Sequence, residues 1–250
     1  AFDHATVLPG AASRLPGGRA PGETQRMHLE PMQLETVRVD GDGPIRHLVL
    51  NRPQVHNAVN PQLVADVQQA LLAIDHDSSI RVVIFRGEGK SLCSGADLKS
   101  PRATPLDAML GSKNGARMYD TLLNLNAVTI IACHGYMIGG GAVLPAACDF
   151  RIGAPSISLT LNEVSIGFNL TWHSIPALVN LVGPHKAKEM LILGRTYGLE
   201  PLDAMGFFTE TVSDEAELVP ACERLAAEVV RQPPVPVTVS KASINAQAMP

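Results

Sequence analysis

The residues most able to do chemistry begin with a glycine-rich turn, Gly139-Gly140-Gly141, that follows an apolar run. A dinucleotide-binding turn needs G-x-G-x-x-G, but Leu144 stands at the third glycine position. A P-loop needs Gly-Lys-Ser/Thr, but here Gly140 is followed by another glycine. What remains is a strand, a tight turn and a helix start, whose backbone N–H groups could stabilise a developing oxyanion. Close packing of a helix against a strand would explain the same three glycines.

A second loop of small residues, 91–99, reads Ser-Leu-Cys-Ser-Gly-Ala-Asp-Leu-Lys and also follows a buried strand-like run. It offers a second turn in which backbone N–H groups are not covered by large side chains. Cys93 lies within it, and a reactive thiol is conceivable there, although no histidine is close in sequence to assist it.

The elements that must position these loops alternate between strands and helices. Strand-like runs at 34–39 and 45–50 flank Asp40-Gly41-Asp42-Gly43, which predicts a hairpin. Asn60-Pro61 then supplies an N-cap and a first-turn proline for an amphipathic helix. Further buried strands are expected at 80–85 and 127–133, with a helix before Asn126. After Gly167 we expect mainly helices, at 175–182, 185–193, 201–205 and 215–230. One short strand, at 208–212, interrupts them. This alternation predicts an α/β fold.

Composition excludes several classes of protein. The chain has 250 residues, 24 acidic against 20 basic, and 46% hydrophobic content, which suffices for one packed core domain. The net charge of −4 argues against nucleic acid as a partner. No apolar run is long enough to span a membrane. Four scattered cysteines form neither a disulfide framework nor a metal site, so we expect no metal and a cytoplasmic location.

The first segment differs from the rest. Residues 1–32 repeat Pro-Gly pairs without a sustained apolar period, so they cannot bury enough surface to offset their ordering entropy. We expect residues 1–32 to be a disordered extension or linker and residues 33–250 to form the domain.

Together the two loops resemble the paired signatures of the crotonase (enoyl-CoA hydratase/isomerase) superfamily, over about residues 34–245. The residues that carry the resemblance are Leu50-Asn51-Arg52-Pro53 with Asn57-Ala58, Ser94-Gly95-Ala96-Asp97-Leu98-Lys99, Gly135-Tyr136-Met137-Ile138-Gly139-Gly140-Gly141, Cys148-Asp149, and Asn162-Glu163 before Gly167. Several motifs in the right order are far more specific than one glycine loop.

The resemblance implies a spiral of repeated ββα units with a helical C-terminal region, and assembly as a homotrimer or homohexamer. It also implies an acyl-CoA thioester substrate, with coenzyme A as part of the substrate and no separate cofactor. The family's oxyanion hole is made by two backbone N–H groups, which match Ala96 and Gly140 here. By the same resemblance the substrate-binding residues are Ala58, Asp97, Leu98, Lys99, Gly141 and Trp172.

The reaction type depends on the carboxylates. Family hydratases use two glutamates; the second matches Glu163, whereas the first matches Val143, and valine cannot transfer a proton. Moving a double bond needs only one base, and one-glutamate members of the superfamily are isomerases. The apolar neighbours Leu161, Val164 and Ile166 should raise the pKa of Glu163 into the range of a general base. A carboxylate in a surface ion pair is the alternative role for Glu163.

A second departure lies between Gly167 and Pro176, where relatives often carry several glycines. Trp172 there should narrow the acyl pocket or fill a gap. His173 could be an alternative acid or base, or could cap the helix that begins near Ser174.

Three functions therefore remain open. The leading one is double-bond isomerisation of an enoyl-CoA by Glu163. The second is hydratase-like, hydrolase or decarboxylase activity, the latter two using His173. The third is a non-catalytic acyl-CoA binding subunit that kept the oxyanion hole. The chain stops soon after Ser240-Lys241, where relatives usually continue through further helices, so we expect those helices either to be absent or to lie outside this sequence.

Overall fold

The computed structural model describes residues 29–100 and 104–248. Its main sheet has seven strands in the order β1-β2-β3-β4-β5-β7-β10. These are β1 Met32–Gln33, β2 Val37–Asp40, β3 Ile45–Leu50, β4 Val82–Gly87, β5 Val128–Cys133, β7 Phe150–Gly153 and β10 Glu210–Thr211. A smaller sheet has the order β6-β8-β9, with β6 Tyr136–Ile138, β8 Ser158–Thr160 and β9 Thr196–Tyr197.

The predicted hairpin is confirmed. β2 and β3 pair antiparallel, with Val37 opposite Leu50 and Asp40 opposite His47, so the Asp-Gly-Asp-Gly segment turns the chain. From β3 onward, the main sheet is parallel. Since parallel strands need crossover connections, helices must lie on the faces of this sheet.

The helices are α1 Pro61–His76, α2 Pro105–Leu123, α3 Gly140–Ala147, α4 Ile175–Leu193, α5 Leu199–Asp203, α6 Leu218–Val230 and α7 Pro234–Ala248. As predicted, Asn60 caps α1, and its side-chain oxygen accepts from Leu63 N at 2.8 Å. The two helices expected at 175–182 and 185–193 are both present within α4, separated by a kink at Gly183, whose backbone is not helical.

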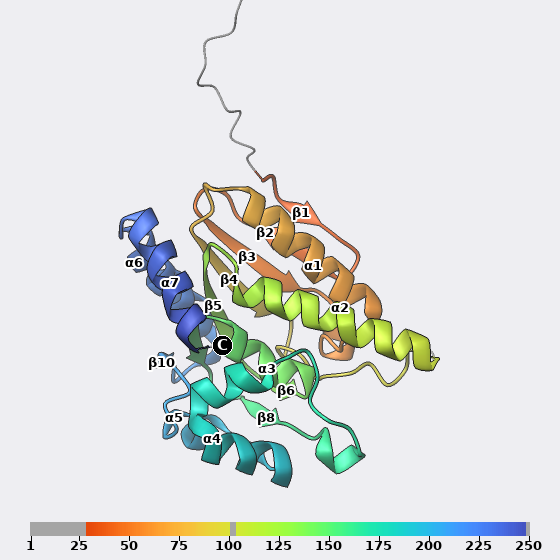
Figure 1. The fold of residues 1–250 in the computed structure, drawn as a ribbon. Helices are drawn as coiled ribbons and strands as arrows, with labels where there is room; N and C mark the ends of the chain where they lie inside the picture. The colour runs from red at the N-terminus through yellow and green to blue at the C-terminus, as the bar shows by residue number, and fades with distance from the viewer. Residues whose placement is uncertain (1–28, 101–103, 249–250) are drawn as a thin grey trace, which may run out of the picture.

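Two apolar layers cover the sheet, and alternate residues of β4 face opposite layers. Phe85 joins the larger layer with α1, α2 and α3, and Ile84 joins the smaller layer with α6. Figure 1 shows this arrangement, with α1 and α2 on one side of the strands and α6 and α7 on the other. The α/β class expected from the sequence is confirmed, as is the helical C-terminal region.

α7 was not predicted, because Pro234, Pro236 and nearby β-branched residues disfavour a helix interior. Its attachment is polar. Lys241 Nζ donates to Ala127 O at 2.8 Å and lies 2.8 Å from Asp149 Oδ2, and Asn245, one turn later, donates to Leu123 O at 2.9 Å. Two residues four apart on one face thus fasten α7 to the end of α2 and to the residues just before β5 and β7.

The domain begins slightly earlier than residue 33. Leu29 N donates to Asp77 Oδ2 at 2.7 Å, and Met32 pairs with Val39 in the sheet. The rest of the expected extension, residues 1–28, lies outside the described residues.

The four cysteines are all free and buried. Cys93, the conceivable reactive thiol, is 0% exposed, and burial raises its pKa to about 11. A thiol in that state is protonated at neutral pH and packs as a small apolar group.

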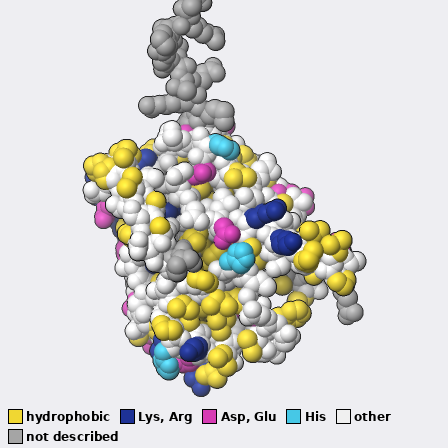
Figure 2. All heavy atoms as spheres, in the orientation of Figure 1, with side chains coloured by type: hydrophobic (Ala, Val, Ile, Leu, Met, Phe, Trp, Pro, Cys, Tyr) yellow, Lys and Arg dark blue, Asp and Glu magenta, His cyan; other side chains and the backbone are white. Residues whose placement is uncertain are grey.

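The surface mixes residue types. Figure 2 shows hydrophobic side chains gathered where the N-terminal end of α2 projects, and the exposed ones there include Leu106, Met109 and Leu110. Within residues 29–100 and 104–248, no helix is both long enough and apolar enough to cross a membrane.

The attachment of α7 yields a first prediction. Lys241→Met keeps the aliphatic stem but leaves Asp149 without its cation, so the free energy of unfolding should fall by roughly 3 kcal/mol. Urea unfolding measures this. Lys188→Met, at an exposed position of α4, is the control and should change stability by less than about 0.5 kcal/mol. Equal losses at both lysines would contradict this role for Lys241.

Candidate active site

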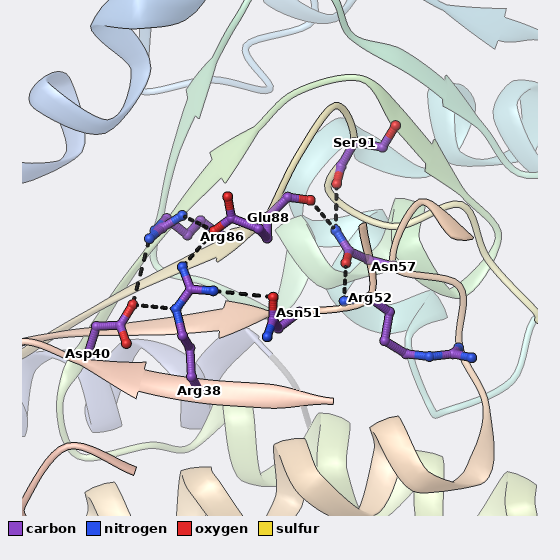
Figure 3. Close-up of polar contacts among 8 residues, drawn as sticks. All are labelled: Arg38, Asp40, Asn51, Arg52, Asn57, Arg86, Glu88 and Ser91. Atoms are coloured by element: carbon purple, nitrogen blue, oxygen red, sulfur yellow. Dashed lines mark hydrogen bonds and ion pairs between the residues drawn. The ribbon is translucent and has the colours of Figure 1, made fainter. Parts of the chain in front are cut away.

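The loop after β4 is held by the side chain of Asn57, which is fully buried. Its Oδ1 accepts from Arg52 N at 2.8 Å, and its Nδ2 donates to Glu88 O at 3.0 Å and to Ser91 O at 2.8 Å. Figure 3 shows the amide lying between the two chain segments that it joins. One side chain therefore ties the segment after β3 to the segment after β4.

A network of charged side chains flanks these three hydrogen bonds of Asn57, which we call the Asn57 clasp. Arg38 Nε donates to Asp40 Oδ2 at 2.7 Å, and Arg38 Nη2 contacts Glu88 Oε2 at 2.5 Å (Figure 3). Arg86 Nη1 reaches the same Glu88 oxygen at 3.4 Å. The hydrogen bond from Arg38 lowers the pKa of Glu88, so the network stays ionised around neutral pH.

A second ion pair fixes the far end of the loop. Arg52 Nη2 lies 2.8 Å from Asp97 Oδ2, and Arg52 Nη1 also donates to Ala58 O. The hydrogen bond from the Arg52 side chain lowers the pKa of Asp97 below its ordinary value. Two of the expected substrate-binding residues, Asp97 and Ala58, thus hold one another through Arg52. Their contact with substrate stays a prediction.

The glycine-rich turn lies directly against this loop. Ile138 N donates to Cys93 O at 3.1 Å, and Cys93 N donates to Tyr136 O at 3.0 Å. A Cβ on Gly95 would lie 2.7 Å from Ile138 O, and a Cβ on Gly141 would lie 2.2 Å from Cys93 O. Only residues without a side chain allow this approach, so close packing is one reason for these glycines. Gly141, expected to bind substrate, faces Cys93.

Gly140 offers a backbone N–H in addition to its close packing against Trp172. It is the first residue of α3, where helix geometry provides no acceptor for its N–H. In the other loop, Val59 bonds to Gly95 O and Asp97 N, so the N–H of Ala96 points away from Val59. Within residues 29–100 and 104–248, neither N–H donates to another protein group. Among the described residues, two N–H groups on neighbouring segments thus lack a protein acceptor, and their role as an oxyanion hole stays a prediction.

Glu163 lies beside this turn. A Cβ on Gly139 would be 2.8 Å from Glu163 Oε1, which places the carboxylate against the residue before Gly140. Glu163 Oε2 is buried and has no hydrogen-bond partner among the described residues. Burial raises the pKa of Glu163 above its ordinary value, and its own backbone N–H partly offsets this. A surface ion pair, the alternative for Glu163, is not what the geometry gives.

The apolar neighbours of Glu163 differ from the expectation. Leu161 is buried, but Val164 is 46% exposed and Ile166 is 58% exposed. These two residues therefore do not enclose the carboxylate, although the predicted direction of the pKa shift holds. Val143 is fully buried in the larger core layer, and its carbonyl accepts from Tyr119 Oη at 3.2 Å.

His173 points away from the turn. Its Nδ1 lies 3.6 Å from Asp120 Oδ2, and its side chain is 75% exposed. It lines a cavity of about 380 Å³ with residues of α2 and α7, among them Leu123 and Lys241. The helix cap is not supplied by His173 either, since Ser174 precedes α4 and no side chain caps that end.

Trp172, Leu98 and Lys99 complete the expected set. A Cβ on Gly140 would lie 2.8 Å from the tip of the Trp172 indole, so this ring borders the site. Leu98 is 91% exposed and Lys99 is also exposed. Both side chains are accessible to a ligand, and their contact with substrate stays a prediction.

Sequence reasoning quoted Arg52 and Asn57 as motif residues but gave them no role. The residue type of Asn57 carried a signal. Asn57 has φ +55°, and asparagine tolerates this conformation better than most residues. The ion pair of Arg52 with Asp97 had no such signal, because the two residues are 45 positions apart in the sequence.

Known proteins place this geometry in a family. The model of the enoyl-CoA hydratase/isomerase family matches residues 41–250, which include both loops and Glu163. The chain belongs to the enoyl-CoA hydratase/isomerase family. Among relatives, crotonyl-CoA hydratase of Syntrophomonas wolfei is 27% identical over 216 residues, 86% of this chain and 83% of the relative. The putative enoyl-CoA hydratase/isomerase YngF of Bacillus subtilis is 34% identical over 200 residues, 79% and 76%.

Solved structures agree with this membership of the enoyl-CoA hydratase/isomerase family. Enoyl-CoA hydratase from Bacillus anthracis superposes with a TM-score of 0.81 at 28% identity, covering 84% of this chain and 82% of that one. The crotonase-like fold expected from the motifs is confirmed.

The Asn57 clasp gives a second prediction. Asn57→Gly keeps the backbone freedom but removes three hydrogen bonds, so the free energy of unfolding should fall by roughly 3 kcal/mol. Asn57→Ala should lose about 1 kcal/mol more, because alanine is strained at φ +55°. Denaturant unfolding of the pair separates the two terms. If alanine proved the more stable variant, the strain argument would fail.

Proposed function

We propose that this member of the family isomerises 3-enoyl-CoA to 2-enoyl-CoA, with Glu163 as the only proton carrier. The observation that carries the proposal is the partnerless carboxylate oxygen of Glu163, buried beside two free backbone donors. Val143, at the position of the other family glutamate, offers no second carboxylate.

The reaction starts when the thioester oxygen binds between the N–H groups of Ala96 and Gly140. Glu163 removes a proton from C2, and the electron pair spreads over a dienolate whose charge rests on the thioester oxygen. Each donor aimed at that oxygen is worth about 3–4 kcal/mol in comparable oxyanion holes. The neutral Glu163 returns the proton to C4, and the double bond moves to the 2,3 position.

The environment of Glu163 suits both halves of this cycle. Burial raises its pKa, which makes the carboxylate a stronger base than an exposed glutamate. Because Oε2 has no partner among the described residues, no protein hydrogen bond must break before it accepts a proton.

Hydration of 2-enoyl-CoA is the second candidate, favoured by the hydratase names of both a relative and a solved structure. Water addition needs the water held and activated between two groups, and Val143 can supply neither a base nor an acid. The hydrolase and decarboxylase readings depended on His173, which is directed at Asp120. A non-catalytic acyl-CoA binding subunit remains as an outcome of the test.

The partners follow from the same proposal. Coenzyme A enters as part of the substrate, and exposed Lys99 is our candidate for one of its phosphates. Assembly as a homotrimer or homohexamer and a cytoplasmic location belong to the proposal as well.

Glu163→Gln tests the proton carrier. The variant keeps size and polarity but cannot accept the proton, so kcat for 3-enoyl-CoA should fall by at least about 100-fold. Mass spectrometry and absorbance of the conjugated thioester separate a positional isomer from a product heavier by one water. A hydrated product from the wild type would favour hydratase activity. Binding without turnover would leave only the binding subunit.

The raised pKa of Glu163 gives a further prediction. Activity needs the carboxylate, so kcat/KM should fall on the acid side with a midpoint above 4.5, the ordinary value. The folded state disfavours the charged form, so Glu163 costs stability above its unfolded pKa. Glu163→Gln should therefore gain stability as pH rises through 4.5 and keep that gain at neutral pH. Thermal unfolding across pH measures this, and a stability loss at neutral pH would contradict it.

A further inference from the structure

The Trp172 indole occupies a specific place between two helices. A Cβ on Gly115, in the middle of α2, would lie 1.9 Å from Trp172 Nε1. A Cβ on Gly140, at the start of α3, would lie 2.8 Å from the opposite end of the ring. The ring therefore spans the gap between α2 and α3, and both of its neighbours must be glycine for it to fit.

The backbone that holds the ring is strained. Trp172 has φ +63° and His173 has φ +55°, two successive residues in the left-handed region that favours glycine. Gly115 adds to the cost, because glycine in a helix interior is unfavourable. Both the strained backbone at Trp172 and the glycine in the middle of α2 cost stability to place this one side chain. That cost points to a role for the Trp172 side chain beyond packing.

We propose that the Trp172 ring closes the acyl side of the site between Gly115 and Gly140 and so restricts the enzyme to short-chain acyl-CoA thioesters. This rests on the proposed function, in which the Gly140 N–H holds the thioester oxygen. An acyl chain that leaves this position toward α2 meets the indole within a few carbon atoms, since the ring tip already touches Gly140.

Removing the indole ring should shift the preference of the enzyme toward longer acyl chains. Each methylene that enters an apolar space contributes about 0.8 kcal/mol, which equals roughly a fourfold gain in affinity. An indole occupies the volume of several methylenes, so a long chain should gain far more than a short one. Trp172→Gly also suits the backbone at φ +63°, which favours folding of the variant.

α2 supplies a matched pair of variants that leaves the tryptophan in place. Gly115→Ala pushes a methyl group into the ring and must displace it. Gly111→Ala, one turn earlier on the same helix, places its methyl group in open space. Both substitutions raise helix propensity equally, so only displacement of Trp172 distinguishes them.

The test compares hex-3-enoyl-CoA with dodec-3-enoyl-CoA by kcat/KM, and hexanoyl-CoA with dodecanoyl-CoA by calorimetric Kd. We compare the preference for the twelve-carbon over the six-carbon thioester, taken as the ratio of kcat/KM values or of affinities. This preference should rise at least tenfold in Trp172→Gly, change in Gly115→Ala, and stay at the wild-type value in Gly111→Ala. Trp172 is the single tryptophan of the chain, so hexanoyl-CoA binding should also shift the emission of the wild type.

Each outcome decides between the two proposals. Turnover with an unchanged chain-length ratio in Trp172→Gly and Gly115→Ala would overturn the role of Trp172 and leave the isomerase intact. A changed Kd ratio without turnover would support the role of Trp172 and overturn the isomerase. Saturating hexanoyl-CoA that leaves tryptophan emission unchanged would also overturn the role of Trp172. No binding of any thioester would overturn both.

Discussion

The amide of Asn57 is the interaction on which the site depends. It joins the segment after β3 to the segment after β4, and the chain that continues from Ser91 carries Ala96, directly after Gly95, which packs against Ile138. A side chain with one acceptor and two donors suits this task, because all three meet backbone groups. The ion pair of Arg52 with Asp97 then fixes the other end of the loop. Backbone donors have no rotamers of their own, so their aim can be no better than that of the segments that carry them.

Two features of the site work against stability. Glu163 holds a carboxylate oxygen that is buried without a partner, and Trp172 with His173 holds a strained backbone. Either would be a defect in a purely structural protein. They lie on either side of Gly140, at the point where substrate charge would develop. The surrounding structure offsets this cost with a main sheet that is parallel from β3 onward and with an apolar layer on each of its faces.

The local elements were predictable, and the contacts between them were less so. The hairpin of β2 and β3 and the start of α1 follow from turn and cap residues close in sequence. α7 escaped prediction because Lys241 bonds to the residue before β5 and Asn245 bonds to the end of α2, and helix propensity does not record such distant contacts. The two loops of the site were predicted from their motifs. The contact of Trp172 with Gly115 was not, since it joins residues far apart in the chain whose spacing carries no periodic signal.

The buried thiols have a consequence for the durability of the enzyme. All four cysteines are inside the fold, and burial raises the pKa of Cys93 to about 11 and those of Cys148 and Cys222 to about 12. Oxidants attack the thiolate, and at neutral pH these groups remain protonated and covered. The proton carrier and the donors that we propose for the site are oxygen and nitrogen groups. Oxidation through a cysteine thiolate is therefore disfavoured as long as the protein stays folded.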